Sequence, residues 1–152
     1  MRRNPAAFAI LVGGLIAGTL DLTYAIIFSA IRGMAPQQLL QLVATGWLGN
    51  AAYDGGVPTA VLGVVSHYFI MFCAAATYYF ASSRIELLRR RPIIGAMLFG
   101  IGMYVVMTFV VLPLSAFPHP IRLIPWIVAL NLLVHMFLVG VPISLAAKRA
   151  RA

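Results

Sequence analysis

The stretch GLIAGTLDLTYA, residues 14–25, lies inside an apolar run of about 26 residues, more than the roughly 20 that a membrane-spanning helix needs. Gly14, Gly18 and Asp21 recur at spacings of four and three, so in a helix they share one face. Small residues let a second helix approach this face closely, and they direct the Asp21 carboxyl toward protein rather than lipid. We therefore predict a spanning helix with an ionisable group on its packed face. Gly14 and Gly18 serve either packing within the chain or a homo-oligomer contact.

The composition of the whole chain is that of a membrane protein. Of its 152 residues, 62% are hydrophobic and 9% are charged, and a soluble domain of this size cannot bury so much apolar surface. The net charge of +8 comes from basic residues at the ends of apolar segments, which is typical of topology signals and not of a nucleic-acid-binding patch. We expect one integral membrane domain over residues 1–152. Its expected partner is a bilayer with anionic lipids, and no nucleic acid is expected.

Four apolar segments are long enough to span, and prolines open the last three, a position that suits proline in the first turn of a helix. A shorter amphipathic segment at about 36–48 ends near Trp47 and predicts an interfacial helix. We expect it to cover the mouth of the bundle, with a gating lid as the alternative. The predicted fold is an all-α up-down bundle of four transmembrane helices, at about 6–31, 58–81, 92–112 and 125–147.

The basic residues predict the orientation in the membrane. Nine of the eleven Lys and Arg residues fall at the two termini and in the middle loop, whereas Arg32 and Arg122 fall on the other side. The positive-inside rule then places both termini in the cytoplasm. The middle loop carries four arginines that we expect to contact anionic lipid headgroups: Arg84, Arg89, Arg90 and Arg91.

Each predicted span carries one hydrogen-bonding side chain at nearly the same depth. Counted from the outer end of its helix, each lies roughly 8 to 10 residues in, or about 12 to 15 Å at 1.5 Å per residue. A lone carboxylate in hydrocarbon is costly, so Asp21 should be protonated or paired, and two imidazoles at its level are the expected partners. Four residues, one in each span, lie at this level: Asp21, His67, Tyr104 and His135. Asn131, one helical turn before His135 on the same face, completes the predicted polar layer.

Three functional hypotheses fit this polar layer. In the first, the protein is a proton or ion relay or is related to transport, acting through Asp21, His67 and His135. In the second, it is a redox component: the same three residues hold a divalent metal such as Zn²⁺ or Fe²⁺, or the two histidines are axial ligands of haem. Asp21 would crowd a haem ring, and the metal ligands have no diagnostic spacing. In the third, the protein is a structural or accessory membrane subunit whose polar layer sets helix register.

Enzyme chemistry has little support in the sequence. Ser66 and His67 are adjacent, which places their side chains on different faces of a helix. The chain has no recognisable spacing of nucleophile, base and orienting residue, and no glycine-rich phosphate loop. We therefore assign no catalytic residue and lean against an enzyme.

Three apolar motifs resemble a known group of proteins. GGLIAGTLD in the first span, SHYF in the second and VHMFLVGVPI in the fourth are similar to small four-helix bacterial inner-membrane proteins of the YagU-like group. The resemblance covers most of the chain. It implies a multi-pass protein of the bacterial inner (cytoplasmic) membrane, and it carries over neither an activity nor catalytic residues.

Overall fold

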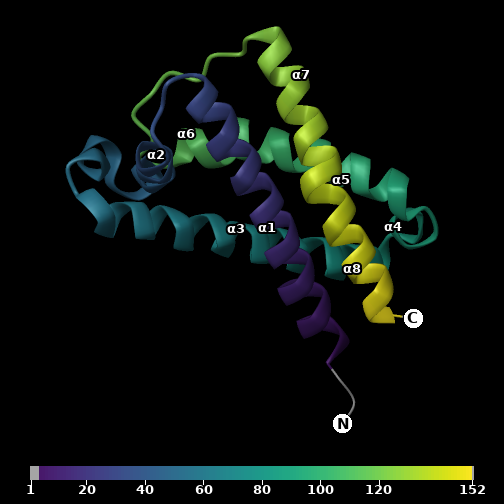
Figure 1. The fold of residues 1–152 in the computed structure, drawn as a ribbon. Coiled ribbons are helices and arrows are strands. Elements are labelled where there is room, and N and C mark those ends of the chain that lie inside the picture. Colours follow the sequence, from purple (N-terminus) through teal and green to yellow (C-terminus); the bar gives the residue numbers. More distant parts are fainter. Residues whose placement is uncertain (1–3, 152) are drawn as a thin grey trace.

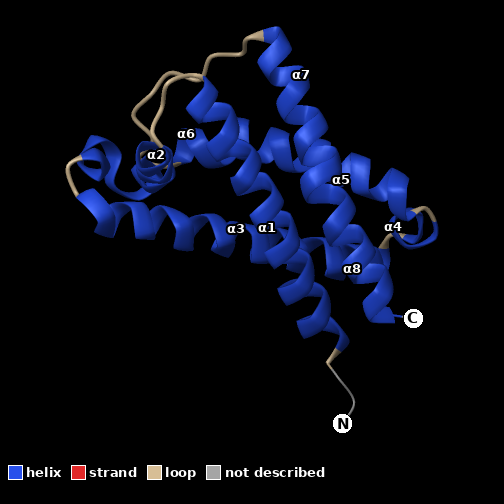
Figure 2. Cartoon of the chain, viewed as in Figure 1, coloured by secondary structure: helices blue, strands red, loops and turns tan. Residues whose placement is uncertain are grey.

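The computed structural model describes residues 4–151, which are almost entirely helical and contain no β-strand (Figure 2). Four segments within this range are long and apolar enough to cross a membrane, with lengths of 27, 29, 23 and 27 residues. They confirm the four predicted spans to within a few residues at each end. The spans are α1 (Pro5–Ile31), α3 (Gly56–Arg84), the segment Pro92–Leu114 that begins with α5, and the segment Pro125–Arg151 that begins with α7.

Helix starts follow from local sequence signals. The Asn4 side chain caps α1, because its Oδ1 accepts hydrogen bonds from the N–H groups of Ala6 (3.1 Å) and Ala7 (3.3 Å). Proline occupies the first turn of α1, α2, α5 and α7, where its missing N–H costs no helical hydrogen bond. The loop after α1 turns at Gly33, whose φ of 86° suits glycine.

Three short elements connect the spans. The predicted amphipathic helix forms as α2 (Pro36–Leu48), continues into the 3₁₀ turn η1 (Gly49–Tyr53) and packs on α3. Its buried Gln41 donates from Nε2 to the backbone oxygen of Gly56 at 3.1 Å, which fixes α2 to the start of α3. Between the second and third spans, α4 (Glu86–Arg90) forms a single short helix.

Two of the spans contain a π-helical turn. α5 (Pro92–Val106) continues through η2 (Met107–Val111) into α6 (Leu112–Leu114), and α7 (Pro125–Val134) continues through η3 (His135–Gly140) into α8 (Val141–Arg151). A proline lies two residues beyond each π turn: Pro113 and Pro142. Proline lacks an N–H and its ring clashes with the preceding turn, so each helix widens before its proline instead of breaking.

Small residues bring the spans together around α1. In Figure 1, α1 and the α7–α8 helix run next to each other, whereas α3 and α5 run across the view. Gly18 faces α3 so closely that a Cβ there would lie 2.9 Å from the Tyr68 ring, and a Cβ on Gly14 would collide with Phe72. Gly14 and Gly18 therefore serve packing within the chain.

The tight core lies in the half of the bundle nearest the described ends of the chain, here called the packed half. On the outer surface of the bundle, large side chains such as Leu11 (58% exposed) and Phe80 (58% exposed) face outward, as expected of a surface covered by lipid. Alanines dominate the buried cluster that defines the packed half: Ala9, Ala17, Met71, Ala74, Ala75, Tyr78, Val139, Ile143 and Ala147.

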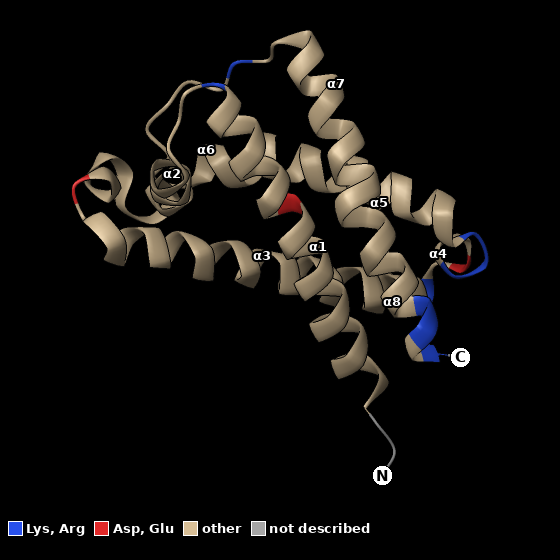
Figure 3. Ribbon diagram, viewed as in Figure 1, with Lys and Arg blue, Asp and Glu red and all other residues tan. Residues whose placement is uncertain are grey.

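Basic residues gather at one end of the molecule. Figure 3 shows the Lys and Arg residues of the α4 region and of the α8 end close together, and two isolated basic segments at the opposite end. The four arginines of the middle loop (Arg84, Arg89, Arg90 and Arg91) are all exposed, as headgroup contacts require. Arg90 forms an ion pair with Glu86 at 2.6 Å.

Candidate functional site

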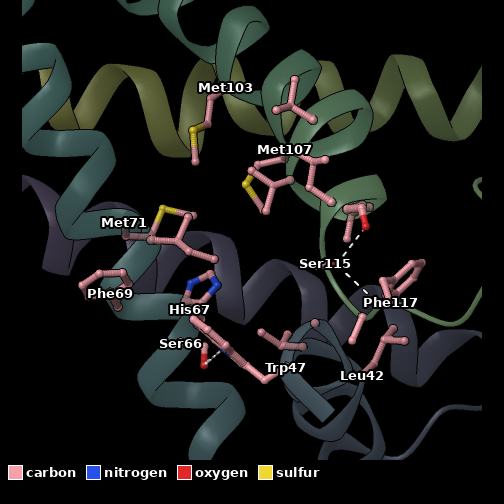
Figure 4. A pocket seen from close by; sticks show the side chains of 18 of the residues that line it. Leu42, Trp47, Ser66, His67, Phe69, Met71, Met103, Met107, Ser115 and Phe117 are labelled. Atoms are coloured by element: carbon pink, nitrogen blue, oxygen red, sulfur yellow. Dashed lines mark hydrogen bonds between the residues drawn. The ribbon is translucent and has the colours of Figure 1, made fainter. Parts of the chain in front are cut away.

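A cavity of about 880 Å³ lies between α3 on one side and α5, η2 and α6 on the other. α3 packs mainly against α1 and α2, whereas α5 packs mainly against η3 and α8. The two helices therefore make little contact with each other, which leaves this space open. Figure 4 shows Met71 and His67 of α3 facing Met103 and Met107 across it. The lining is mostly apolar with a few polar groups, the usual character of a small-molecule site.

Asp21 of α1 lines this cavity and is partly exposed to it. Its carboxylate makes no hydrogen bond or ion pair with any of residues 4–151, so the expected pairing with the imidazoles is not formed. A carboxylate in an apolar, membrane-embedded cavity is stable only when it is protonated or has a cation beside it. The site is therefore suited to a proton or a positively charged ligand.

The two histidines of the spans also line the cavity, and each uses one ring nitrogen to bond the backbone. His67 is buried on α3, and its Nε2–H donates to the Gly18 carbonyl oxygen at 2.9 Å. His135 begins η3, and its Nδ1–H donates to the Asn131 carbonyl oxygen at 2.9 Å. These bonds fix both tautomers, and they leave Nδ1 of His67 and Nε2 of His135 for a ligand or a proton.

The other two residues of the predicted polar layer, Tyr104 and Asn131, lie next to His135 and outside the cavity lining. The Tyr104 ring packs edge-on against the His135 ring, with centroids 5.6 Å apart. The Asn131 side chain accepts a hydrogen bond from the Tyr24 hydroxyl at 3.3 Å. Neither Tyr104 nor Asn131 lines the cavity. The predicted layer thus divides into three residues that share the cavity and two that hold one of them in place.

The geometry gives no support to a three-ligand metal site. Within the described range, no three His, Cys, Asp or Glu side chains come together as metal ligands would. Asp21, His67 and His135 share one cavity without converging on one point. The haem hypothesis needs only His67 and His135, and each keeps one ring nitrogen free.

α2 closes one end of the cavity. The Trp47 indole N–H donates to Ser66 Oγ at 2.9 Å, which ties the end of α2 to α3. The Ala116 N–H donates to the Gly46 carbonyl oxygen at 2.9 Å, which ties the loop after α6 to α2. These contacts hold α2 against this end of the cavity, which its residues Leu42, Val43 and Trp47 line.

A second contact holds the proline-rich loop over the same end. The Tyr53 hydroxyl and His119 Nε2 form a hydrogen bond of 2.8 Å, and burial raises the pKa of Tyr53, so the hydroxyl keeps its proton at neutral pH. Reasoning from the sequence missed this contact, because Tyr53 and His119 lie 66 residues apart in two connecting segments and no pattern in the sequence links them. It also missed Phe69 and Phe117, which add aromatic walls to the cavity from separate segments.

Comparison of the chain with protein-family models, with curated proteins and with solved structures gives no match. The resemblance to the YagU-like group therefore stays a prediction. The function has to be inferred from the cavity and its three ionisable residues.

Proposed function

We propose that the protein binds a lipophilic cation in the cavity between α3 and α5, and that it takes part in proton-coupled transport of that cation. One observation carries this proposal: the Asp21 carboxylate lies in an apolar cavity and has no partner among residues 4–151. Either a proton or a cation neutralises such a carboxylate. Because the two compete for Asp21, uptake of one releases the other.

The remaining polar groups of the cavity favour a cation over an anion. No Lys or Arg of the described chain lines it. When neutral, the free ring nitrogens of His67 and His135 accept hydrogen bonds and so add acceptors to the carboxylate of Asp21. The wall also contains three aromatic residues, and the faces of aromatic rings attract positive charge: Trp47, Phe69 and Phe117.

The proposal includes a bacterial cytoplasmic membrane, an up-down bundle and cytoplasmic termini. The gathering of basic residues around α4 and α8 supports this orientation through the positive-inside rule. The cavity then belongs to the outer half of the bundle, and the packed half separates it from the cytoplasm. Transport would require a second state in which the packed half opens.

Tetraphenylphosphonium binding to the protein in nanodiscs, measured by isothermal titration calorimetry, tests the proposal. We expect tetraphenylphosphonium to bind and tetraphenylborate, an anion of the same shape, to bind much more weakly. Binding should weaken as the pH is lowered, because protons then occupy the carboxylate. Asp21→Asn should lower the affinity at least tenfold, as expected for the loss of a charged partner.

A matched pair of variants tests the location of the site. Val106 and Val110 lie one turn apart and are both 46% exposed, but only Val110 lines the cavity. Val110→Phe should therefore weaken tetraphenylphosphonium binding, whereas Val106→Phe should leave it unchanged. Equal affinity for the two ions, or wild-type affinity in Asp21→Asn, would contradict the proposal.

A haem-binding redox component is the second candidate. His67 and His135 each hold one ring nitrogen on a backbone carbonyl and leave the other free, which is the arrangement of histidines that ligate metals. The absorption spectrum and the metal content of protein purified from membranes test this candidate. A Soret band that disappears in His67→Phe would support haem. Protein with neither a Soret band nor stoichiometric metal would rule out the candidate.

A further inference from the structure

A second cavity, of about 290 Å³, lies where α3, α4 and α8 meet. It is separate from the first cavity and lies at the end of the bundle where basic residues gather. Segments far apart in the sequence build it. Its polar lining consists of three basic and three hydroxyl residues, here called the basic pocket: Arg89, Lys148, Arg151, Tyr78, Ser82 and Ser144.

The positive charge of the basic pocket is not balanced by nearby carboxylates. Glu86 is the nearest acidic residue in the sequence, and it pairs with Arg90 rather than with Arg89. No other ion pair joins residues of the range 4–151, so Arg89 and Lys148 have no carboxylate partner there. Cations held around one small cavity repel each other, and an anion between them relieves this repulsion.

Hydrogen bonds fix the floor of the pocket. Ser144 Oγ donates to the Pro92 carbonyl oxygen at 2.8 Å and shares a hydrogen bond of 2.7 Å with the Tyr78 hydroxyl. The Tyr78 hydroxyl also donates to the Leu88 carbonyl oxygen at 3.3 Å. With their protons engaged in this way, the two hydroxyls act as a rigid floor and not as donors to a ligand. The donors available to an anion are the N–H groups of the basic side chains.

Arg151 is held in position while part of its guanidinium stays available. Its Nη1 donates to Ser82 Oγ at 2.8 Å, its Nη2 donates to the Tyr79 carbonyl oxygen, and its guanidinium carbon lies 4.5 Å from the centre of the Tyr79 ring. Arginine carries five N–H donors, so these contacts leave others for an anion. Lys148 and Arg89 make no hydrogen bond with the described chain, and their donors are free as well.

We propose that the basic pocket binds the phosphate of an anionic phospholipid. Arginine and lysine are the residues that recognise phosphate, and basic pockets between helix ends are typical headgroup sites. A lipid fits better than a soluble phosphate because the pocket lies at the ends of two spans. The exposed apolar side chain of Ile85, four residues before Arg89, also offers contact to an acyl chain. This proposal is independent of the cation site in the first cavity.

Native mass spectrometry with dioleoyl phosphatidylglycerol tests the proposal, with dioleoyl phosphatidylcholine as the control lipid. Arg89 and Arg90 are neighbours in the sequence, as are Lys148 and Arg149. Only Arg89 and Lys148 line the pocket, but a change to glutamine removes one positive charge at any of the four positions. Arg89→Gln and Lys148→Gln should each lower the affinity for phosphatidylglycerol about fivefold. The matched controls Arg90→Gln and Arg149→Gln should change it less than twofold. Binding of phosphatidylcholine should be the same in all four variants.

Three results would overturn the proposal. Equal losses within each pair would show general attraction of a basic surface, and equal affinity for the two lipids would show that no anionic headgroup is recognised. Displacement of phosphatidylglycerol by an equal concentration of inorganic phosphate would show that the ligand is free phosphate. All four residues are exposed, so thermal unfolding in phosphatidylcholine nanodiscs should stay as in wild type. Each pair by itself is a complete test of the proposal.

Discussion

The packed half and the half that holds the large cavity are built from the same four spans, yet their interiors differ completely. In the packed half, α1 and α3 meet through residues such as Ala9, Ala17 and Ala74, which leave almost no space between the backbones. In the other half, the long, flexible side chain of Met107 lines an open cavity of about 880 Å³, and Met71 and Met103 lie at its border with the packed half. Side-chain size along each span therefore decides where the bundle is closed.

The polar groups follow the same division. Asp21, His67 and His135 all lie where the packing is open, whereas the packed half contains hydroxyl groups that are paired with each other or with the backbone. Close packing leaves room only for polar atoms with fixed partners. Loose packing allows groups that change partner or proton. In the packed half these polar groups therefore contribute to stability, whereas Asp21 and one ring nitrogen of each histidine have no partner among residues 4–151.

The largest expected effect comes from a glycine between the two halves. Gly100 faces the backbone of η3, and a Cβ there would collide with the His135 carbonyl group. Gly100→Ala should lower the free energy of unfolding by about 3 kcal/mol, since a backbone contact cannot rotate away. Circular dichroism during denaturation in mixed micelles measures this change. A Cβ on Gly102 of the same helix would meet no atom within 4 Å, so Gly102→Ala should be neutral or slightly stabilising. Similar losses in both variants would contradict the packing described here.

An intermediate effect is expected from a buried hydroxyl of the packed half. Tyr78→Phe removes the hydrogen bond to Ser144 and should lower the free energy of unfolding by about 1 to 2 kcal/mol. The neighbouring Tyr79 hydroxyl makes no hydrogen bond with residues 4–151, so Tyr79→Phe serves as the control and should cost less than about 0.5 kcal/mol. Chemical denaturation of the two variants side by side gives the comparison. If Tyr79→Phe were the more damaging change, the assignment of the buried hydrogen bond would be wrong.

The smallest effect on stability is expected in the cavity half. Asp21→Asn removes no hydrogen bond or ion pair with residues 4–151, so the free energy of unfolding should not fall by more than about 0.5 kcal/mol. The same variant should lose tetraphenylphosphonium binding. Asp54→Asn, in an exposed turn, is the matched control for a neutralised aspartate. A loss of more than about 1 kcal/mol in Asp21→Asn alone would favour the third hypothesis, in which the polar layer only sets helix register.

The spans and the short helix could be predicted because apolar length, prolines at helix starts and amphipathic spacing are local signals. Asp21, His67 and His135 line one cavity, and counting residues along each helix was enough to group them. The rotation of each helix about its axis is set by packing. For this reason Tyr104 and Asn131 belong to the predicted layer but do not line the cavity.

The two cavities themselves could not be predicted. The first depends on the separation of α3 and α5, which is set by the α1 and η3 segments that pack between them. The basic pocket depends on contacts between Arg89 in the middle of the chain and Lys148 and Arg151 near its end. Charge counting placed these residues on one side of the membrane, but only the folded chain brings them around one space.

The π turn η3 determines how α8 is rotated about its own axis. A π turn contains one residue more than the α-helical turn it replaces, so its loss would rotate everything beyond it by about 100° around the axis. Ser144, Lys148 and Arg151 all follow this turn. A single-residue deletion within 135–140 would therefore turn their shared face away from Tyr78 and Ser82. One extra residue next to the first cavity thus determines the angular position of the basic pocket at the other end of the bundle.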